Sequence, residues 1–321
     1  QLRETSIRDI RDVQYMERLD QEARQKLENI AHIADAMIGE ALASSGNQHA
    51  LDTAVKDLST WAATYVEGDN ETGRKIVAEA RKSLSIDLPT GKSPRKPFHW
   101  ALEFPEVFER GGFDGIVGNP PFMGGKKISG GLGSSYREFI VEQIASGVKG
   151  NADLCTFFFI RASKLVKPKC VFGMLATNTI SQGDTREVGL DQVSEKNPII
   201  KALPSLKWPG KANLEVAIVW IACSEWEGEY FIDDHYVPGI SSYLVSVDTV
   251  TGVPFQLQEN DEIAYVGQIV LGDGFVLSPE KAASLIKKDT KNNDVLFEYL
   301  SGKDATSRPD QSPSRWVINF F

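Results

Sequence analysis

The most informative part of the chain is Gly111-Gly-Phe-Asp-Gly-Ile-Val-Gly-Asn-Pro-Pro-Phe122. Its apolar run from Phe113 to Val117 has glycines on both sides, which predicts a short buried strand. Two prolines cannot continue a central strand, because neither carries an N–H for the ladder. We therefore expect the strand to end at Gly118 and residues 119–122 to form a stiff loop. In open α/β sheets, ligands bind at the carboxyl ends of the strands.

Beyond this loop, strand-like and helix-like segments alternate. The expected helices are 134–146, 153–166 and 185–193, and the expected strands are 170–176, 199–204 and 214–222. Such alternation predicts an α/β fold with a mostly parallel sheet and crossover connections. We expect the glycine-rich stretch 123–133 to be a mobile loop.

The two ends of the chain differ from this middle part. The first 97 residues have a helical period and abundant Glu, Arg, Gln and Ala, with expected helices at 8–42, 50–66 and 75–84 and a proline-rich linker at 87–97. The acidic end holds short β-like runs at 230–237, 242–248 and 263–270 and an expected helix at 279–288. We therefore predict three parts: a helical subdomain (1–97), a central α/β domain (98–224) and the start of a β-rich domain (225–321).

Composition excludes several classes of protein. Apolar residues make up 41% and charged residues 25%, as in ordinary globular domains. No apolar run reaches the roughly 18 residues that span a bilayer, so we expect no membrane contact. Three cysteines inside apolar stretches predict free thiols in a reducing cytoplasm, and the four histidines lack ligand spacing, so no metal is expected.

Charge is unevenly distributed. The net charge of −9 argues against general binding to nucleic acid. Residues 111–221, however, hold 13 Lys and Arg against 9 Asp and Glu, and they include the Asn-Pro-Pro-Phe loop. This excess is compatible with a surface that faces phosphates.

The loop has a chemistry of its own. Proline after Asn119 restricts that residue to extended conformations, so the Asn119 side-chain oxygen and the Pro120 carbonyl can be held as two fixed acceptors. Two acceptors suit an NH₂ group, and Phe122 offers a face on which an NH₂-bearing base can stack. Accepting both hydrogen bonds favours a pyramidal nitrogen whose lone pair is directed at an electrophile. No side-chain base is needed, because the proton becomes acidic once the nitrogen is alkylated.

These residues resemble a known family. "FDGIVG" followed by "NPPF" resembles motif IV of the S-adenosylmethionine-dependent N6-adenine DNA methyltransferases. The stretch 151–180 resembles motifs V and VI, and 206–221 ("LKWPGKANLEVAIVWI") resembles motif VIII. Residues 299–321 are similar to the opening of the target-recognition region of large type II restriction–modification and phage-defence methylases, and 1–97 resemble the helical insertion ahead of motif IV.

The resemblance implies roles for particular residues. The catalytic loop would be Asn119, Pro120, Pro121 and Phe122: Asn119 and Pro120 accept the N6 hydrogens of adenine, and Phe122 stacks on the base after it is flipped out of double-stranded DNA. Trp208 would pack against the flipped base, Lys211 would hold a phosphate, and Asn178 would line the pocket. S-adenosylmethionine would be the methyl donor, with Asn119 in part of its pocket. Further restriction or defence subunits are expected partners.

The chain departs from the family pattern in one respect. The glycine-rich cofactor turn and the acidic residue that follows it in the family have no counterpart in 1–110. We expect a partial Rossmann-like sheet in a piece of a longer protein, inactive alone.

Two other functions stay open. The same loop type serves enzymes that methylate RNA bases or protein glutamine, and a non-catalytic DNA-binding or scaffold subunit would also keep the fold. Trp208 can likewise be a packed surface tryptophan.

Overall fold

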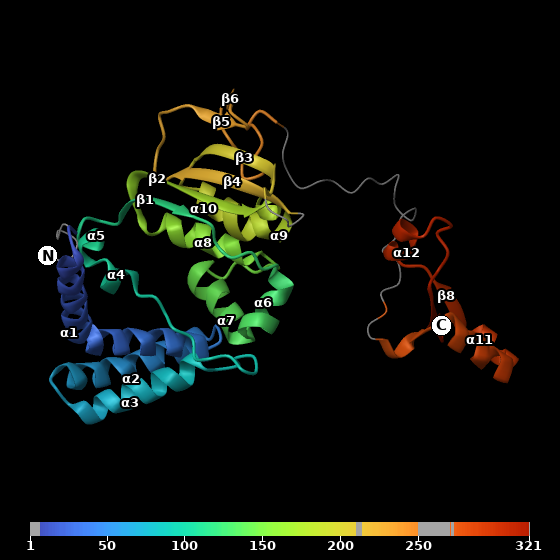
Figure 1. The fold of residues 1–321 in the computed structure, drawn as a ribbon, viewed down its shortest axis with the longest axis horizontal. Helices are drawn as coiled ribbons and strands as arrows, with labels where there is room; N and C mark the ends of the chain where they lie inside the picture. Colours follow the sequence, from blue (N-terminus) through green and yellow to red (C-terminus); the bar gives the residue numbers. More distant parts are fainter. Residues whose placement is uncertain (1–6, 210–213, 250–269, 271–272, 321) are drawn as a thin grey trace. The chain divides into compact units, whose positions relative to one another are not determined.

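The structure is a computed structural model that describes residues 7–209, 214–249, 270 and 273–320 (Figure 1). The chain divides into two compact units, Gln1–Gly252 and Val253–Phe321. Each unit has a hydrophobic core of its own. None of the described helices is both long and apolar enough to cross a membrane.

Three helices begin unit 1: α1 (Ile10–Ala43), α2 (Gln48–Val66) and α3 (Asn70–Leu84). Asp9, Asn47 and Asp69 cap their amino ends through side-chain oxygens, which fixes where each helix starts. A small core that includes Leu58 and Ile76 joins them. These helices confirm the predicted helical character of this part of the chain.

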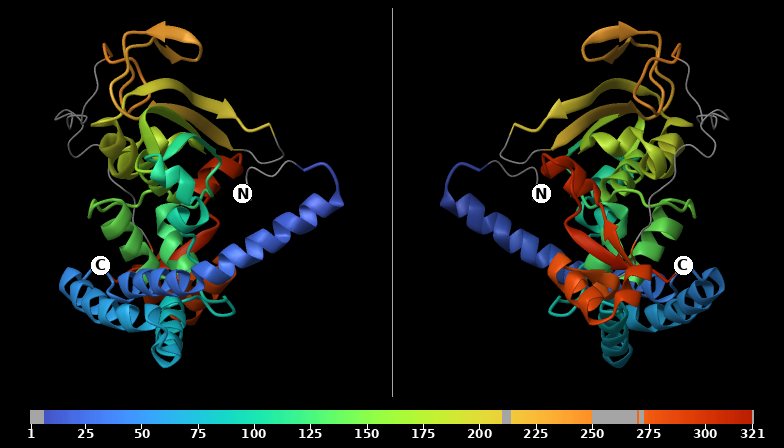
Figure 2. Two further views of the ribbon diagram at one scale, coloured as in Figure 1. Left: turned by 90° about the vertical axis from the view of Figure 1, so that its left-hand side faces the viewer. Right: turned by 90° about the vertical axis from the view of Figure 1, so that its right-hand side faces the viewer.

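Full burial in α1 is confined to its carboxyl-terminal half. Its buried residues all lie between Ala36 and Leu42, whereas Ile10 and Tyr15 are exposed. Figure 2 shows the amino-terminal half of α1 projecting away from α2 and α3.

The proline-rich segment after α3 is docked rather than extended. Arg95 donates to the carbonyls of Leu84 and Ile86 at 3.1 and 2.8 Å and to the carbonyl of Leu132. Asp87 accepts from the Ser135 N–H at 2.7 Å. These bonds tie the helical part to the helices that follow the Asn-Pro-Pro-Phe loop. Two short helices, α4 (Trp100–Glu103) and α5 (Pro105–Glu109), then lead into the sheet.

A mixed six-stranded sheet forms the centre of unit 1. Its order is β1-β2-β4-β3-β5-β6, built from β1 (Phe113–Gly118), β2 (Val166–Thr177), β3 (Ile199–Lys207), β4 (Glu215–Ala222), β5 (Tyr230–Ile232) and β6 (His235–Val237). The β1/β2 and β3/β5 pairs are parallel, and the β2/β4, β3/β4 and β5/β6 pairs are antiparallel. The α/β class is confirmed. Short β3/β4 and β5/β6 hairpins reverse two strands, so the sheet is less uniformly parallel than the alternation suggested.

Helices cover one face of this sheet, as Figure 1 shows for α8, α9 and α10. They are α8 (Leu154–Ser163), α9 (Gly183–Arg186) and α10 (Gln192–Ser194). The 3-10 turn η2 (Asn178–Ser181) connects β2 to α9, and the π-helical turn η3 (Glu187–Asp191) connects α9 to α10. Helix α8 is apolar along most of its length because it is buried. Its Phe159 packs edge-on against Phe172 of β2, with ring centroids 6.3 Å apart.

Three predictions of local structure were wrong. The strand at 113–117 was expected to be buried, but β1 is an edge strand without a buried residue, and Val117 is 94% exposed. The glycine-rich stretch after the loop is helix α6 (Gly125–Leu132), followed by α7 (Ser134–Phe139) and the turn η1 (Ile140–Ile144). Burial of Ile128, which is 1% exposed, holds α6 in place in spite of its glycines. The predicted strand 242–248 consists of turns with one isolated bridge at Ser246. Most of the predicted strand 263–270 lies outside the described residues.

The sheet of unit 1 continues past residue 224, because β5 pairs with β3. Unit 2 contains a three-stranded sheet of order β7-β9-β8, formed by β7 (Val276–Leu277), β8 (Leu296–Tyr299) and β9 (Arg315–Ile318). Helix α11 (Pro279–Lys288) confirms the predicted helix 279–288, and α12 (Gly302–Ser307) follows β8. The division of the chain at residues 97 and 224 stays a prediction.

Candidate active site

Strand β1 delivers the Asn-Pro-Pro-Phe loop to one edge of the sheet. Gly112, before the strand, has φ of +123°, and a Cβ there would lie 2.5 Å from the Leu165 carbonyl oxygen, so only glycine fits. The next residue, Phe113, donates its N–H to the same oxygen at 2.9 Å. Pairing with β2 ends at Gly118 opposite Met174, and the loop begins at the following residue.

The loop residues differ in exposure in a way that suits a binding surface. Asn119 and Pro121 are exposed, whereas Pro120 is buried. Phe122 is half-buried and packs against the core of the α/β domain. The ring is therefore held by the protein on one side and remains partly accessible on the other.

Three of the predicted site residues leave the sheet at the same edge. Asn119 follows β1, Asn178 follows β2 and Trp208 follows β3. β4 is antiparallel to both β2 and β3, so β1, β2 and β3 all run in one direction. The carboxyl ends of such strands form the ligand-binding edge of α/β sheets. The structure thus places at one edge of the sheet three residues that are far apart in the sequence.

The positions of these residues along the strand direction follow from the strand registers. Asn119 is one residue past the Gly118–Met174 pair, while Asn178 is four residues past Met174. At the usual rise of a strand, Asn178 extends about 10 Å further in the strand direction. Trp208 is level with Asn178 to within one residue, and β4 between them separates the two laterally by about 10 Å.

Sequence reasoning missed Glu215, the first residue of β4. Its Oε2 accepts from Asn178 Nδ2 at 3.1 Å and from Ser205 Oγ at 2.8 Å. Glu215 therefore connects the ends of β2 and β3 at the site edge. The signal for it was one carboxylate at the start of an otherwise apolar strand.

Of the two site residues predicted from the stretch 206–221, the structure describes only Trp208. Trp208 is half-buried, and its backbone N–H donates to the Leu214 carbonyl at 2.8 Å, which joins the end of β3 to the start of β4. Lys211 lies outside the described residues.

Neither the Cys155 thiol of α8 nor the Tyr136 phenol of α7 is activated. Burial, and then the charge of Asp153, raises the pKa of the Cys155 thiol well above its usual range. Burial also raises the pKa of Tyr136. Both groups stay protonated at neutral pH, so neither is prepared for nucleophilic attack. Within the described ranges no cluster of three His, Cys, Asp or Glu could hold a metal ion.

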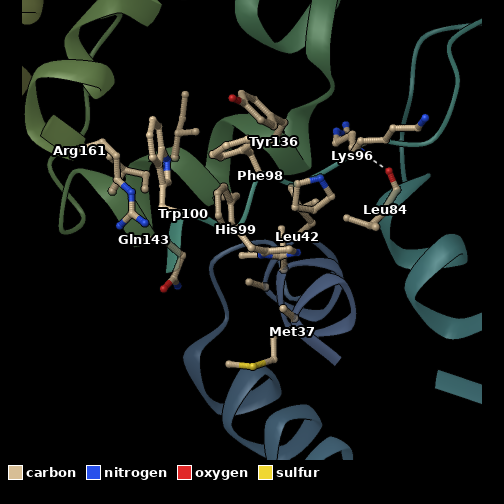
Figure 3. A pocket seen from close by; sticks show the side chains of 18 of the residues that line it. Met37, Leu42, Leu84, Lys96, Phe98, His99, Trp100, Tyr136, Gln143 and Arg161 are labelled. Carbon is tan, nitrogen blue, oxygen red and sulfur yellow. Dashed lines mark hydrogen bonds between the residues drawn. The ribbon is translucent and has the colours of Figure 1, made fainter. Parts of the chain in front are cut away.

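A separate cavity of about 870 Å³ lies between the helical part and the α/β domain. Figure 3 shows aromatic side chains, among them Phe98, Trp100 and Tyr136, around it, with Arg161 and Gln143 at one side. Asn119, Asn178 and Trp208 do not line this cavity. The chemistry of the loop therefore belongs to the sheet edge and not to the cavity.

Comparisons with known proteins bear on the class of this protein. Residues 49–200, a little under half of the chain, match the family described as Eco57I restriction-modification methylase. A Methanocaldococcus jannaschii protein, RM.MjaORFECS2P, whose name describes it as a type II restriction enzyme and methyltransferase, is 30% identical over 88 residues, which are 27% of this chain and 7% of that protein.

Among solved structures, the Type IIL restriction-modification enzyme MmeI in complex with DNA superposes with a TM-score of 0.51 at 16% identity, over 77% of this chain and 36% of that one. This likeness concerns the fold. The chain spans well under two thirds of the length of either relative. In sequence, this chain is therefore similar over part of its length to restriction-modification methylases.

Proposed function

We propose that the parent protein methylates the N6 amine of adenine in double-stranded DNA, within a restriction–modification or phage-defence system, with S-adenosylmethionine as methyl donor. One observation carries the proposal. An Asn-Pro-Pro-Phe loop leaves the carboxyl end of β1 with Asn119 exposed and with Phe122 supported from one side. Similarity to restriction–modification methylases supports DNA as the substrate.

The proposed grip on the base uses three groups of the loop. The Asn119 side-chain oxygen and the Pro120 carbonyl would accept the two N6 hydrogens. Phe122 would stack on the flipped adenine, a contact worth roughly 1–3 kcal/mol. Because both acceptors sit on a loop stiffened by two prolines, little reorganisation is needed when charge develops on the nitrogen. The released N6 proton passes to water.

The opposite wall of the pocket would come from the ends of β2 and β3. Trp208 would contact the base or its edge. Asn178, oriented by Glu215, would be part of the same wall. The exposed Lys126 and Lys127 at the start of α6 are placed just after the loop, where a DNA backbone could approach.

The described residues fit the base half of this site better than the methyl-donor half. Every element from residue 10 to 109 is helical, whereas a glycine-rich cofactor turn must follow a strand. Only Asn119 is a candidate for contact with S-adenosylmethionine. The donor, when bound, supplies an electrophilic methyl group, and we assign no further residue of this chain to it.

The test is transfer of labelled methyl from S-adenosylmethionine by the full-length protein to mixed-sequence duplex DNA, which is then digested to nucleosides. We expect label in N6-methyladenine with wild type and at least a hundredfold less with Asn119→Ala, as for loss of a preorganised acceptor. Asn197→Ala is the matched control, because Asn197 precedes β3 at the opposite edge of the sheet and its side chain donates to the nearby Val193 carbonyl.

The other outcomes have definite meanings. Label in RNA or protein glutamine would replace the DNA substrate and keep the loop chemistry. DNA binding without transfer to any acceptor would indicate a scaffold subunit. Equal loss in Asn119→Ala and Asn197→Ala would remove the special role of Asn119.

A further inference from the structure

We propose that Asp153 is a positioning residue for the Asn119–Phe122 loop, through Met123, the residue that follows Phe122. The consequence for catalysis rests on the proposed function, whereas the mechanical role does not. Asp153 is the N-cap of α8 and is 7% exposed.

The contact with the loop uses both backbone groups of Met123. The Met123 N–H donates to Asp153 Oδ1 at 3.1 Å, and the Met123 carbonyl accepts from the Leu154 N–H at 2.9 Å. The loop packs through Pro120 and Phe122 but has few backbone hydrogen-bond donors, because Pro120 and Pro121 carry no N–H. Met123 is therefore the point at which the exit of the loop is attached to the rest of the domain.

Asp153 does more than cap a helix. A cap needs one bond from the side chain to the first turn, and Asp153 Oδ1 makes that bond to the Cys155 N–H at 3.1 Å. The bond to Met123 is made by the same oxygen and spans 30 residues of sequence. A buried carboxylate is costly unless it is hydrogen-bonded, and here two backbone donors satisfy it.

The segment that carries Asp153 is itself held from the other side. The Asp153 N–H donates to Thr185 Oγ1 at 3.3 Å, and Thr156 Oγ1 donates to the Thr185 carbonyl at 3.4 Å. The Asn151 N–H donates to Asp184 Oδ2 at 2.6 Å. Thr156 and Thr185 are both buried, so these bonds are shielded from water.

This arrangement links the loops that follow β1 and β2. Asp184 and Thr185 belong to α9. This helix begins five residues after Asn178, which is the first residue past β2. The segment from Asn151 to Asp153 contacts that helix on one side and Met123 on the other. The exits of two neighbouring parallel strands are thus braced against one short segment, and their relative position is fixed.

Fixing the exit matters because the entry of the loop is already fixed by β1. With both ends held, Asn119 and the Phe122 ring keep one placement relative to the sheet edge. A displacement of about 1 Å in a reacting group can cost about a hundredfold in rate. We therefore expect loss of the brace to lower kcat more than it raises KM for DNA, because the displaced groups are those that contact the reacting amine and its base.

Two substitutions separate the brace from the cap. Serine caps helices well, but its Oγ lies one bond closer to the backbone than Asp153 Oδ1. Asp153→Ser therefore keeps the bond to Cys155 and loses the reach to Met123. Asp153→Asn keeps an acceptor oxygen for both. Asp69→Ala is the matched control, since Asp69 caps α3 in the helical part and accepts from Glu71.

The experiment measures hydrogen–deuterium exchange in the full-length protein together with kcat and KM for methyl transfer to DNA. Peptides that span residues 117–124 contain few exchanging amides, because two of their positions are proline. Met123 supplies one of these amides. We expect Asp153→Ser to exchange about tenfold faster at Met123, as for loss of one hydrogen bond, and to lower kcat. Asp153→Asn and Asp69→Ala should match wild type in loop exchange and in kcat.

Two results would overturn the inference. One is a wild-type Met123 amide that exchanges as fast as an unstructured one, which needs no variant to fold. The other is unchanged exchange at Met123 in folded Asp153→Ser. If instead exchange responds as expected but wild type transfers no methyl to adenine in DNA, the proposed function fails and the positioning role stands.

Discussion

Gly125, the first residue of α6, gives a quantitative test of how tightly the segment after the loop is packed. A Cβ at this position would lie 2.4 Å from the carbonyl carbon, 2.5 Å from the oxygen and 2.7 Å from the Cα of Asn151. All three are backbone atoms, so no side chain can rotate away. In Gly125→Ala either α6 or the segment that carries Asp153 must move.

The size of the movement follows from these distances. Carbon atoms in contact are ordinarily about 3.5–4.0 Å apart, so a separation of 2.4 Å must open by about 1 Å or more. Overpacking of this kind costs about 1–3 kcal/mol in stability. A shift of about 1 Å next to the loop can also cost about a hundredfold in rate. We expect both effects in Gly125→Ala.

Gly130 provides a matched control in the same helix. A Cβ at Gly130 meets nothing within 4 Å, and its backbone is helical. Gly130→Ala should therefore stabilise the protein by about 0.4–1 kcal/mol, through the lower entropy of the unfolded chain. The assays are the midpoint of thermal unfolding and the methyl-transfer rate of the full-length protein. Equal midpoints and rates for the two variants would refute the close packing of α6 on Asn151.

Three further outcomes follow from particular side chains. Burial, and then Cys170, raises the pKa of Cys223 to about 11, so its alkylation by iodoacetamide at pH 8 should be about a hundredfold slower than for a thiol of pKa 9 and should rise with pH to about 11. The Ser314 and Ser301 hydroxyls hold the pKa of Asp304 well below its usual range, so its stabilising effect on unit 2 is complete above about pH 4 and is lost as the pH falls through the folded pKa. Amide exchange in β8 and β9 should therefore be faster in Asp304→Asn than in wild type at pH 7, and this difference should be smaller in strong acid. Glu215→Ala should lower methyl transfer and shift unfolding by under about 1 kcal/mol, because the contacts of Glu215 are exposed.

Hydrophobic periodicity and breaker residues were enough to predict the helices and strands that local interactions determine. The helices α1 to α3 and the strands β1, β3 and β4 follow from periodicity and from breakers at their ends. The loop after β1 could be located because two consecutive prolines offer no N–H for pairing with a neighbouring strand. Prediction failed at α6, whose glycines indicate a loop. Contacts made by Ile128 with residues remote in sequence stabilise the helix, and no local rule encodes them.

The site shows the same division. The loop and Trp208 were identified from their motifs, but the roles proposed for them stay predictions. Asp153 and Glu215 were missed because each acts through partners far away in the sequence, Met123 for the one and Asn178 for the other. Such pairs become visible only once the strand order is known.

The antiparallel strand β4 sets the spacing of the residues at the site edge. If β3 lay directly beside β2, Asn178 and Trp208 would be about 5 Å apart. Insertion of β4 doubles that separation. Because β4 runs in reverse, it presents its first residue at the site edge, and Glu215 there bonds to Asn178 and Ser205. The same hairpin that separates Asn178 from Trp208 therefore also fixes the ends of β2 and β3 relative to each other.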